Sequence, residues 1–384
     1  MASVFSKIKS RASRVINLIL KELESLFKDK QALLIMFLLP ILVIFAIGST
    51  SSAIQGKSTV VIGIIDLDTS TGYPGQDLSL NFTRTLDNLV DDKGTDYVVI
   101  RNYTKAEIDT KVPWYELQAG KIDAYIEIPE GFETAITTIS VVYMNITTDA
   151  TNIAGQANAL NAIIEAIAIF KVQHDFYADE ILPSMDQLWF YNTNLFRTAG
   201  PVFAISIFGS TLMTASQSVV GDVPLKRMLL TPARKAEVIL AKLLAYMIIG
   251  FFQILILIGL STFVYQMPIS GGIGGVLLLI LLLLTLAFAG ITLGLFISVV
   301  STSRLQASQY FLLAFIMMFI LTYFVSSDIF GAILPLPLAS SGFNDIAYKY
   351  YVPGALDDIF RISMFGIVSL GLAFAVFYLK KSTI

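Results

Sequence analysis

The sequence has no cysteine, one histidine (His174) and few charged residues, and each shortage excludes a class of protein. Without cysteine there is no disulfide framework, no thiolate metal site and no cysteine nucleophile. One histidine leaves no histidine-rich metal centre. Only 14% of the 384 residues are charged, where a soluble domain carries roughly a quarter, and the net charge is −3. An ordinary cytosolic enzyme, a disordered protein and a nucleic-acid-binding protein are therefore not expected, nor is a metal ion or cofactor held by this chain.

Long apolar runs, in contrast, are abundant, since 55% of the residues are hydrophobic. A helix of about 20 apolar residues crosses the hydrocarbon core of a bilayer. Six stretches reach this length and have no charged side chain in their central part. The sequence therefore predicts an α-helical, multi-pass membrane protein with six spans, at residues 32–53, 199–220, 238–265, 275–300, 307–327 and 359–379.

Basic residues gather in four segments that fall on one side of this six-span arrangement. They are residues 1–30, the loop at 221–242, the short loop at 301–306 and the C-terminal end. Because Lys and Arg are enriched in cytoplasmic loops, both termini are predicted to be cytoplasmic, in the cell (plasma) membrane. Residues 54–198 carry nine basic and twenty acidic side chains, a net charge of −11, and are expected outside.

Residues 1–30 have apolar side chains at spacings of three and four, which predicts a basic amphipathic helix rather than a cleavable signal peptide. Such a helix lies on the inner membrane surface, and packing on a partner protein is the alternative. The apolar positions are Phe5, Ile8, Ala12, Val15, Ile19, Leu23 and Leu26.

Residues 54–198, between the first span (31–53) and the second, are predicted to form an α/β domain with a mixed sheet and a long helix. Strand-like runs occur at 59–66, 96–101, 122–128 and 139–145. Helical spacing joins Leu78, Phe82, Leu86 and Leu89, and a long helix is expected at about 153–181. One face of this helix, expected to pack on the sheet or on a second subunit, carries Ile153, Ala157, Leu160, Ile164, Ile167 and Ala168.

Few side chains of this domain are candidates for modification or for binding a metal ion. Asn81, Asn102 and Asn145 each begin an Asn-X-Thr sequon, so they are candidate N-glycosylation sites, although chance produces such patterns easily. His174 is expected within the long helix as a solvated or satisfied side chain. The carboxylates of Asp66 and Asp68, and of Asp91 and Asp92, could hold a cation, but turn formation explains them better.

The loop at 221–237 joins the second and third spans and reads as a short helix, a break and a second helix. Asp222 can cap the first helix, with Pro224 in its opening turn. Thr231 and Pro232 end it and restart the chain, because the residue before proline avoids the helical region. A small apolar knob flanked by basic residues suits docking in a groove of another protein; it consists of Leu225, Met228 and Leu229.

This loop resembles the coupling segment of the type-2 ATP-binding-cassette (ABC-2) permeases. Leu225, Met228, Leu229, Thr231, Pro232, Lys235, Glu237, Ala241 and Lys242 fall in register with the family pattern, and Tyr246 and Gln253 are also typical. Val223 and Pro224 replace the usual Gly–Thr, and Val219 stands where an acidic residue is expected. The first span, the outer domain, residues 293–309 and the region 328–358 are similar to the family as well.

The resemblance implies a permease subunit whose residues 199–384 carry the second to sixth spans, with 328–358 as short re-entrant outer helices. The chain has no phosphate-binding loop motif, so ATP and Mg²⁺ are expected in a separate ABC ATPase subunit. Six spans are half of the family's working unit, which implies a homodimer or a pair with a second permease. The expected activity is export of a hydrophobic or amphiphilic substrate, of the drug, lipid or peptide class.

Two other functions remain open at this point: an ion- or proton-coupled secondary transporter, and a non-transporting receptor or scaffold. A coupled carrier usually keeps charged side chains inside the bilayer, and none is evident here. The second span instead has hydroxyls four residues apart, which either line a substrate path or serve interhelical packing. They are Ser206, Ser210, Thr214 and Ser218. Gly290, Gly294 and Ser298 form a small-residue face that is expected to pack.

Overall fold

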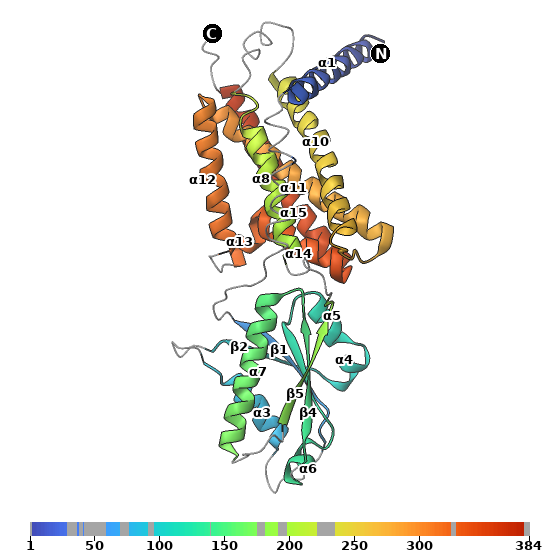
Figure 1. Cartoon of the computed structure of the whole chain (residues 1–384), viewed down its shortest axis with the longest axis vertical. Helices are drawn as coiled ribbons and strands as arrows, with labels where there is room; N and C mark the ends of the chain where they lie inside the picture. Colours follow the sequence, from blue (N-terminus) through green and yellow to red (C-terminus); the bar gives the residue numbers. More distant parts are fainter. Residues whose placement is uncertain are drawn as a thin grey trace. The chain divides into compact units, whose positions relative to one another are not determined.

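A computed structural model describes residues 2–28, 37, 41, 59–69, 77–90, 96–138, 140–174, 181–190, 198–220, 235–323 and 328–379. The chain divides into two compact units (Figure 1). One is helical and combines Met1–Ser51 with Thr193–Ile384, and the other, Ser52–Asn192, contains the sheet. That this second unit lies outside the cell stays a prediction.

The sheet has five strands in the order β2-β1-β3-β4-β5. β1 pairs in parallel with both β2 and β3, β3 pairs antiparallel with β4, and β4 pairs in parallel with β5. The prediction of a mixed sheet is therefore confirmed. The strands are β1 (Val60–Asp66), β2 (Val98–Asn102), β3 (Ala124–Ile128), β4 (Val142–Asp149) and β5 (Ile181–Leu188).

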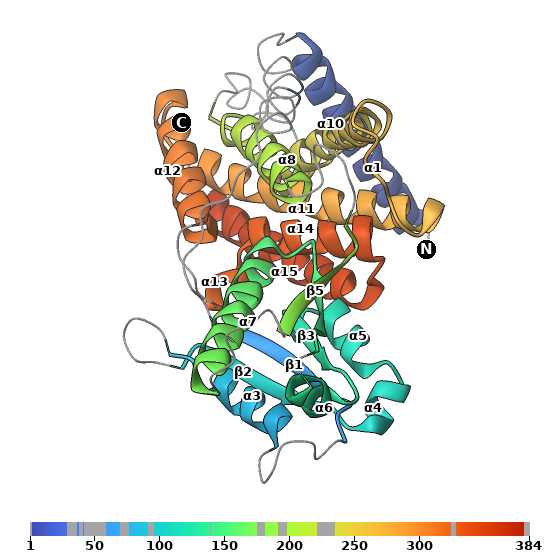
Figure 2. The ribbon, with the colours of Figure 1, turned by 60° about the horizontal axis from the view of Figure 1, so that its bottom comes forward.

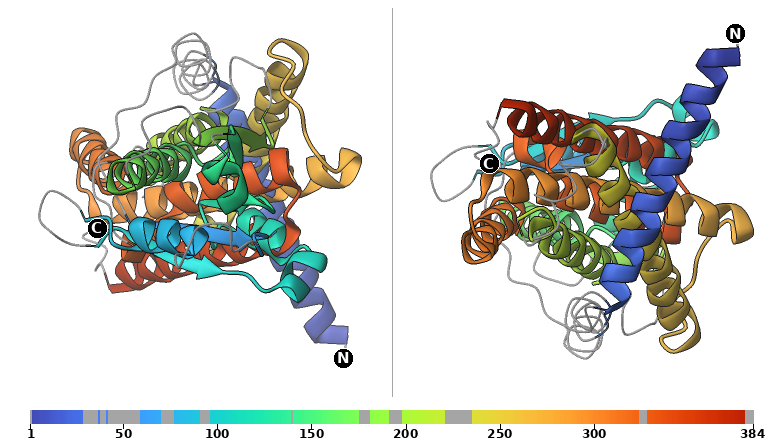
Figure 3. Two further views of the ribbon diagram at one scale, coloured as in Figure 1. Left: turned by 90° about the horizontal axis from the view of Figure 1, so that it is seen from below. Right: turned by 90° about the horizontal axis from the view of Figure 1, so that it is seen from above.

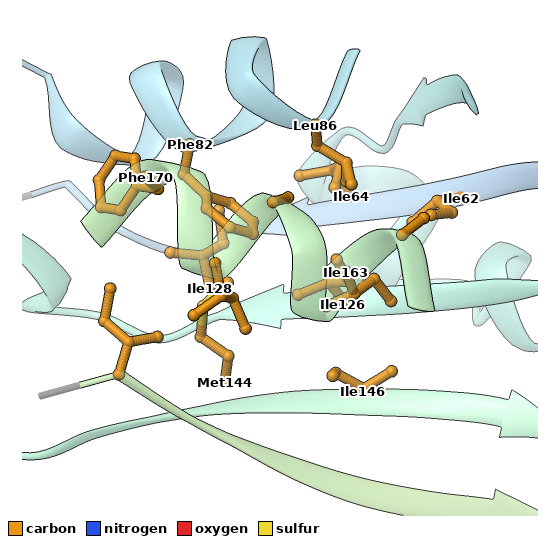
Figure 4. Close-up of a cluster of buried hydrophobic side chains, with 14 of the residues drawn as sticks. Ile62, Ile64, Phe82, Leu86, Ile126, Ile128, Met144, Ile146, Ile163 and Phe170 are labelled. Carbon is orange, nitrogen blue, oxygen red and sulfur yellow. The ribbon is translucent and has the colours of Figure 1, made fainter. Parts of the chain in front are cut away.

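Both faces of β1 are covered, which explains its unbroken apolar run, since strands covered on both faces do not alternate with polar residues. Ile62 and Ile64 lie in the main hydrophobic core of this unit, shown in Figure 4. Ile65 and the half-buried Val61 belong to a smaller cluster on the opposite face. Successive side chains of a strand point to opposite faces, so one run serves two cores.

The main core lies between the sheet and two helices, α3 (Leu78–Asp87) and α7 (Ile153–Gln173) (Figure 2). Asp77 caps α3 by accepting a hydrogen bond from the backbone N–H of Leu80 at 2.9 Å. The predicted apolar face of α3 is confirmed, because Leu78, Phe82, Leu86 and Leu89 are all buried. The remaining helices of the unit are short: α4 (Lys105–Asp109), α5 (Val112–Gln118) and α6 (Phe132–Thr137).

Two predictions for the long helix are wrong. The helix ends at Gln173 instead of continuing to 181, so His174 is its C-cap residue and not a mid-helix residue. The face that packs on the sheet is also rotated from the expected one, because Ile164 is 53% exposed whereas its neighbour Ile163 is buried. Packing of the expected face on a second subunit stays a prediction. The helix is apolar nearly all round, so its spacing did not identify the buried side. The buried face runs through Ala159, Ala162, Ile163, Ala166, Ile167 and Phe170.

The helical unit begins with α1 (Ala2–Lys28). Among the described residues, five helices are long and apolar enough to cross a membrane, by length and composition. They correspond to the second to sixth predicted spans, while the first, 32–53, lies outside the described residues apart from Phe37 and Ile41. The five are α8 (Ala199–Ser216), α10 (Lys235–Phe263), α11 (Gly272–Val300), α12 (Arg304–Tyr323) and α15 (Val352–Leu379).

The last of these helices starts earlier than predicted, at Val352 instead of residue 359, because Pro353 is tolerated in a first turn. Asp357, Asp358 and Arg361 are therefore part of the helix. Before it, the region 328–358 contains the short helices α13 (Asp328–Ile333), α14 (Pro335–Asn344) and the π-helical turn η1 (Asp345–Lys349). That these helices re-enter the membrane stays a prediction.

The small-residue face of α11 packs directly on α8, as expected. A Cβ atom added to Gly294 would lie 2.7 Å from both the Cβ of Ala215 and the carbonyl oxygen of Leu212. One turn further, the Ser298 hydroxyl oxygen accepts hydrogen bonds from the backbone N–H groups of Val219 and Val220, at 2.9 and 3.2 Å. At position 294, only glycine, which has no side chain, allows the backbones of α8 and α11 to approach this closely.

We predict that Gly294→Ala lowers the free energy of unfolding of the helical unit by about 1–3 kcal/mol, because the added methyl group collides with the backbone of α8. Thermal unfolding in detergent measures the change. Gly259→Ala is the matched control, since Gly259 lies within α10 with no atom within 4 Å of an added Cβ. Equal midpoints for the two variants would contradict the close α8–α11 contact.

We also predict a pH dependence in the sheet-containing unit. Burial and a 2.9 Å hydrogen bond to Glu165 raise the pKa of Tyr97 from 10.0 to about 12. The neutral phenol is thus favoured in the folded state, and this stabilisation is lost as the pH rises from about 10 through 12.

Tyr97→Phe should make the loss of stability between pH 10 and 12 less steep. Tryptophan fluorescence reports unfolding of this unit, because both tryptophans of the chain, Trp114 and Trp189, belong to it. Tyr143→Phe, at an exposed position, is the control and should leave the slope unchanged. The assignment is wrong if the two variants lose stability in parallel.

Candidate functional site

The predicted coupling residues fall into two groups in the structure. Residues 221–234, with Asp222, Pro224, Leu225, Met228, Leu229, Thr231 and Pro232, lie outside the described residues. Lys235 begins α10, and Glu237 lies in its first turn. The coupling segment therefore connects the end of α8 to the start of α10, and the described neighbours of these two ends can be analysed.

The amphipathic helix α1 packs on the start of α10 (Figures 1 and 3). The Nζ atom of Lys242 lies 2.8 Å from Oε1 of Glu22. Lys242 is 1% exposed and Glu22 is 7% exposed, so the pair is buried. A second ion pair joins Arg14 to Glu237, which is itself buried, over 3.5 Å. A buried ammonium group must be paired, and the partner of Lys242 comes from α1.

Apolar contacts reinforce these ion pairs. Leu26 of α1 belongs to one buried cluster with Val219, in the turn that follows α8, and with Ile239 and Leu243 of α10. The same cluster includes residues of α11 and Phe377 of α15. Five helices thus meet at the two ends of the coupling segment. Of the predicted apolar face of α1, the side chains of Phe5, Ile8 and Ala12 lie outside the described residues.

Another apolar stripe of α1 is exposed and faces away from α10. It consists of Ile16, Leu20 and Phe27, which lie on one side of the helix and are each more than half exposed. The helix therefore has two apolar faces, one in contact with α10 and one uncovered among the described residues. The uncovered face is compatible with the membrane surface that the sequence predicts for this helix.

The hydroxyl stripe of the second span lies mainly inside the helical unit. Ser206 and Ser210 are buried in α8, whereas Thr214 and Ser218 are half-buried. The Ser210 hydroxyl oxygen accepts a hydrogen bond from Nε2 of Gln253 in α10 at 2.8 Å. The hydroxyls of Thr214 and Ser218 donate to carbonyl oxygens of their own segment, those of Ser210 and Ala215. These contacts fit the packing interpretation, and a role in a substrate path stays a prediction.

The sequence reasoning missed a group of charged residues in η1 and in the first turns of α15. The Asp345 carboxylate of η1 lies 3.7 Å from Nζ of Lys349, and both side chains are largely buried. Asp358 in α15 is also buried. Asp357 and Asp358 lie in the first turns of α15, directly before the predicted span at 359–379. The signal was the Asp357–Asp358 pair directly before a long apolar run.

The candidate residues of the sheet-containing unit have structural roles where they are described. Asp68 accepts hydrogen bonds from the backbone N–H groups of Gly131 and Glu133, at 3.1 and 3.3 Å, at the start of α6. Asp66 accepts from the Ser79 hydroxyl at 2.7 Å. Capping and turn formation therefore explain these carboxylates. Asp91 and Asp92 lie outside the described residues.

The remaining candidates of this unit lie at its surface. The ring of His174 packs on Phe170, with 4.6 Å between ring centroids. Asn102 and Asn145 are exposed, and Asn81 is half-buried on α3, so N-glycosylation of the three stays a prediction. Among the residues that the structure describes, no group of three or more His, Asp or Glu side chains could hold a metal ion.

Comparison with known families identifies the family of the chain. The profile of the ABC-2 family transporter proteins matches residues 30–379, which is most of the chain. The comparison with curated proteins gave no match. The chain therefore belongs to the ABC-2 transporter family, and it is a multi-pass membrane component of an ABC transport system. Such a permease is normally the non-catalytic membrane subunit and works with an ABC ATPase subunit.

The buried pair of α1 and α10 gives a test of how the site is held. Lys242→Met leaves the Glu22 carboxylate buried without its partner, so we predict a loss of about 3 kcal/mol in the free energy of unfolding. Glu22→Leu combined with Lys242→Met removes both charges and should recover most of the loss. Thermal unfolding in detergent measures both effects.

The exposed pair of Lys28 and Glu24, 2.6 Å apart on the same helix, is the control. Lys28→Met should leave the unfolding midpoint unchanged, because exposed ion pairs contribute little. A Lys242→Met variant as stable as the parent protein would show that α1 is not held to α10 by this pair.

Proposed function

We propose that this ABC-2 chain is the transmembrane permease of an ATP-driven exporter. It moves a hydrophobic or amphiphilic substrate, of the drug, lipid or peptide class, out of the cytoplasm. Two permease copies, as a homodimer or as a pair with a second permease, form the working unit. A separate ATPase subunit binds ATP and Mg²⁺ and supplies the energy. The family membership supports the class of protein, and the contacts around α10 support the coupling route.

The observation that carries the proposal is the anchoring of both ends of the segment 221–234. Before the segment, the backbone N–H groups of Val219 and Val220 are bonded to Ser298 of α11. After it, Glu237 and Lys242 are bonded to α1. A displacement of the segment is thus transmitted to four packed helices, α1, α8, α10 and α11, which is the requirement for a coupling element.

In this mechanism the apolar knob of the segment docks in a groove of the ATPase. By its sequence, the segment is expected to form a short helix that starts at Asp222 and Pro224 and ends at Thr231 and Pro232, which would hold the knob on a stiff element. Closure of the ATPase around nucleotide then pushes the segment, and the helices rock to release substrate between the two permease copies. The knob consists of Leu225, Met228 and Leu229.

The polarity of the described helices supports an apolar or amphiphilic cargo. The long faces of α10, α11 and α12 are apolar, and the polar contacts between α8 and α10 are neutral, as between Gln253 and Ser210. The buried charges lie near the helix ends, as with Lys242 and Asp345. A carrier driven by protons or ions usually keeps such groups along its pathway.

With the basic loops inside, both termini are cytoplasmic.

The decisive experiment replaces the apolar knob by charge, with Leu225→Glu, Met228→Glu and Leu229→Glu in one variant. Permease and ATPase subunit are purified together, reconstituted in liposomes, and the rate of ATP hydrolysis is measured. The parent permease should stimulate hydrolysis, and the variant should leave the ATPase at its own basal rate. A carboxylate in an apolar groove is strongly disfavoured, which is the physical reason for the expected loss.

Leu305→Glu is the matched control, since Leu305 is 71% exposed and borders the other basic loop on the same predicted side. It should stimulate the ATPase as the parent does. Full stimulation by the knob variant would show that the docking assignment is wrong. Transport by the purified chain without an ATPase would favour a secondary carrier.

A further inference from the structure

The sheet-containing unit has a cavity of about 430 Å³ on the face of the sheet opposite the main core. It lies between the short helices α4 and α5 and the strands β1 and β3; Figure 2 shows α5 beside β3. Pockets that bind small organic molecules typically have volumes of about 300–1,000 Å³. The residues that define its chemistry are Ile65, Lys111, Trp114, Tyr115, Tyr125 and Glu127.

Three aromatic residues, Trp114, Tyr115 and Tyr125, line the cavity. The rings of Trp114 and Tyr115 meet edge to face, with 5.1 Å between centroids. Trp189, from the end of β5, lies against Trp114 with 5.7 Å between centroids. The sequence has two tryptophans, and the fold brings both to this place although 75 positions separate Trp114 from Trp189. Tyr115 is 56% exposed, so its ring is not buried in the hydrophobic core of the unit and is accessible to a ligand.

Two residues beside the cavity have left-handed backbone conformations that side chains rarely adopt. They are Lys111, with φ of 57°, and Trp189, with φ of 56°. Lys111 is the N-cap of α5, and Pro113 follows in the first turn. Such strain persists only where the surrounding structure fixes it, and it is frequent at ligand sites.

The charges around the cavity favour a positively charged ligand. Glu127 of β3 is half-buried in the lining. The ion pairs of the described part of this unit join Arg101 to Glu107 and to Glu116, and Glu127 takes part in neither. Residues 54–198 have a net charge of −11, which raises the local concentration of cations. Lys111 also lines the cavity, but its long side chain is exposed and can turn to solvent.

We propose that this cavity binds an amphipathic organic cation. The aromatic faces of Trp114, Tyr115 and Tyr125 attract the positive charge, and Ile65 contacts the apolar body of the ligand. The Glu127 carboxylate neutralises the charge. This site belongs to the sheet-containing unit alone, so it does not depend on the ATPase partner or on the direction of transport.

Tetraphenylphosphonium and tetraphenylborate test the proposal, because they have the same shape and opposite charge. Each is titrated into the purified full chain in detergent, and binding is followed by tryptophan fluorescence, which reports only from the unit with Trp114 and Trp189. Tetraphenylphosphonium should quench the fluorescence saturably, with a dissociation constant at least about tenfold lower than that of tetraphenylborate.

Four variants keep both tryptophans and separate the contributions. Glu127→Gln should weaken binding of tetraphenylphosphonium about tenfold. Glu130→Gln removes the same charge from an exposed position outside the lining and should have no such effect. Tyr115→Leu should weaken binding several-fold, and Lys111→Asn should strengthen it, because asparagine tolerates the left-handed conformation.

Equal quenching by the two ions, or no saturable quenching by tetraphenylphosphonium, overturns the proposal. Unchanged affinity in Glu127→Gln also overturns it, provided that the variant keeps the circular dichroism of the parent. If Glu130→Gln weakens binding as much as Glu127→Gln does, the overall negative charge of the unit, and not the cavity, explains the binding. That result also overturns the proposal.

Discussion

The buried ion pair between Glu22 and Lys242 fixes the N-terminal helix α1 against α10 in the helical unit. An ammonium group in an otherwise apolar helix cannot stay buried without an opposite charge, because its loss of hydration costs several kcal/mol. The required carboxylate comes from α1, about 220 positions earlier in the chain. The N-terminal helix is thus held against α10 by an electrostatic requirement, and the contact of Leu26 with Ile239 and Leu243 follows from that placement.

The two faces of the sheet are used differently. One face is closed by α3 and α7 with fully buried apolar side chains, including an edge-to-face contact of Phe82 with Phe170 at 5.6 Å between centroids. The other face is covered only in part, by the short helices α4 and α5, and Trp114, Tyr125 and Trp189 on this side are only half-buried. A closed face stabilises the unit, whereas an incompletely covered one leaves room for a ligand.

The sequence predicted those helices and strands that a pattern of neighbouring residues is sufficient to identify. Run length identified the spans, and helical spacing identified α3 with its buried Phe82 and Leu86. The strand β5 was missed because Pro183 argues against a strand; the structure tolerates it since β5 pairs only with β4 and forms an edge of the sheet. The buried side of α7 was misplaced because Ile163 and Ile164 are equally apolar, and only the packing partner distinguishes them.

The candidate site shows the same division. Glu237 and Lys242 were recognised from the resemblance of the loop to the family pattern. Their partners Arg14 and Glu22 were not, because no local pattern relates residues so far apart in the chain. Asp358 was missed for a different reason, since the predicted span began after it.

The ends of a helix usually fray, because their terminal N–H and C=O groups have no partner within the helix. If a coupling segment were attached to fraying ends, a displacement of the segment would unwind these ends locally and would not move the helices. Here the N–H groups after α8 are bonded to the Ser298 hydroxyl, and the first turns of α10 are bonded through Glu237 and Lys242 to a separate helix. Unwinding either end would expose a buried charge or break a buried hydrogen bond, each at a cost of a few kcal/mol. Under the proposed mechanism, rigid displacement of α1, α8, α10 and α11 together is therefore the least costly response to a push on the segment between them.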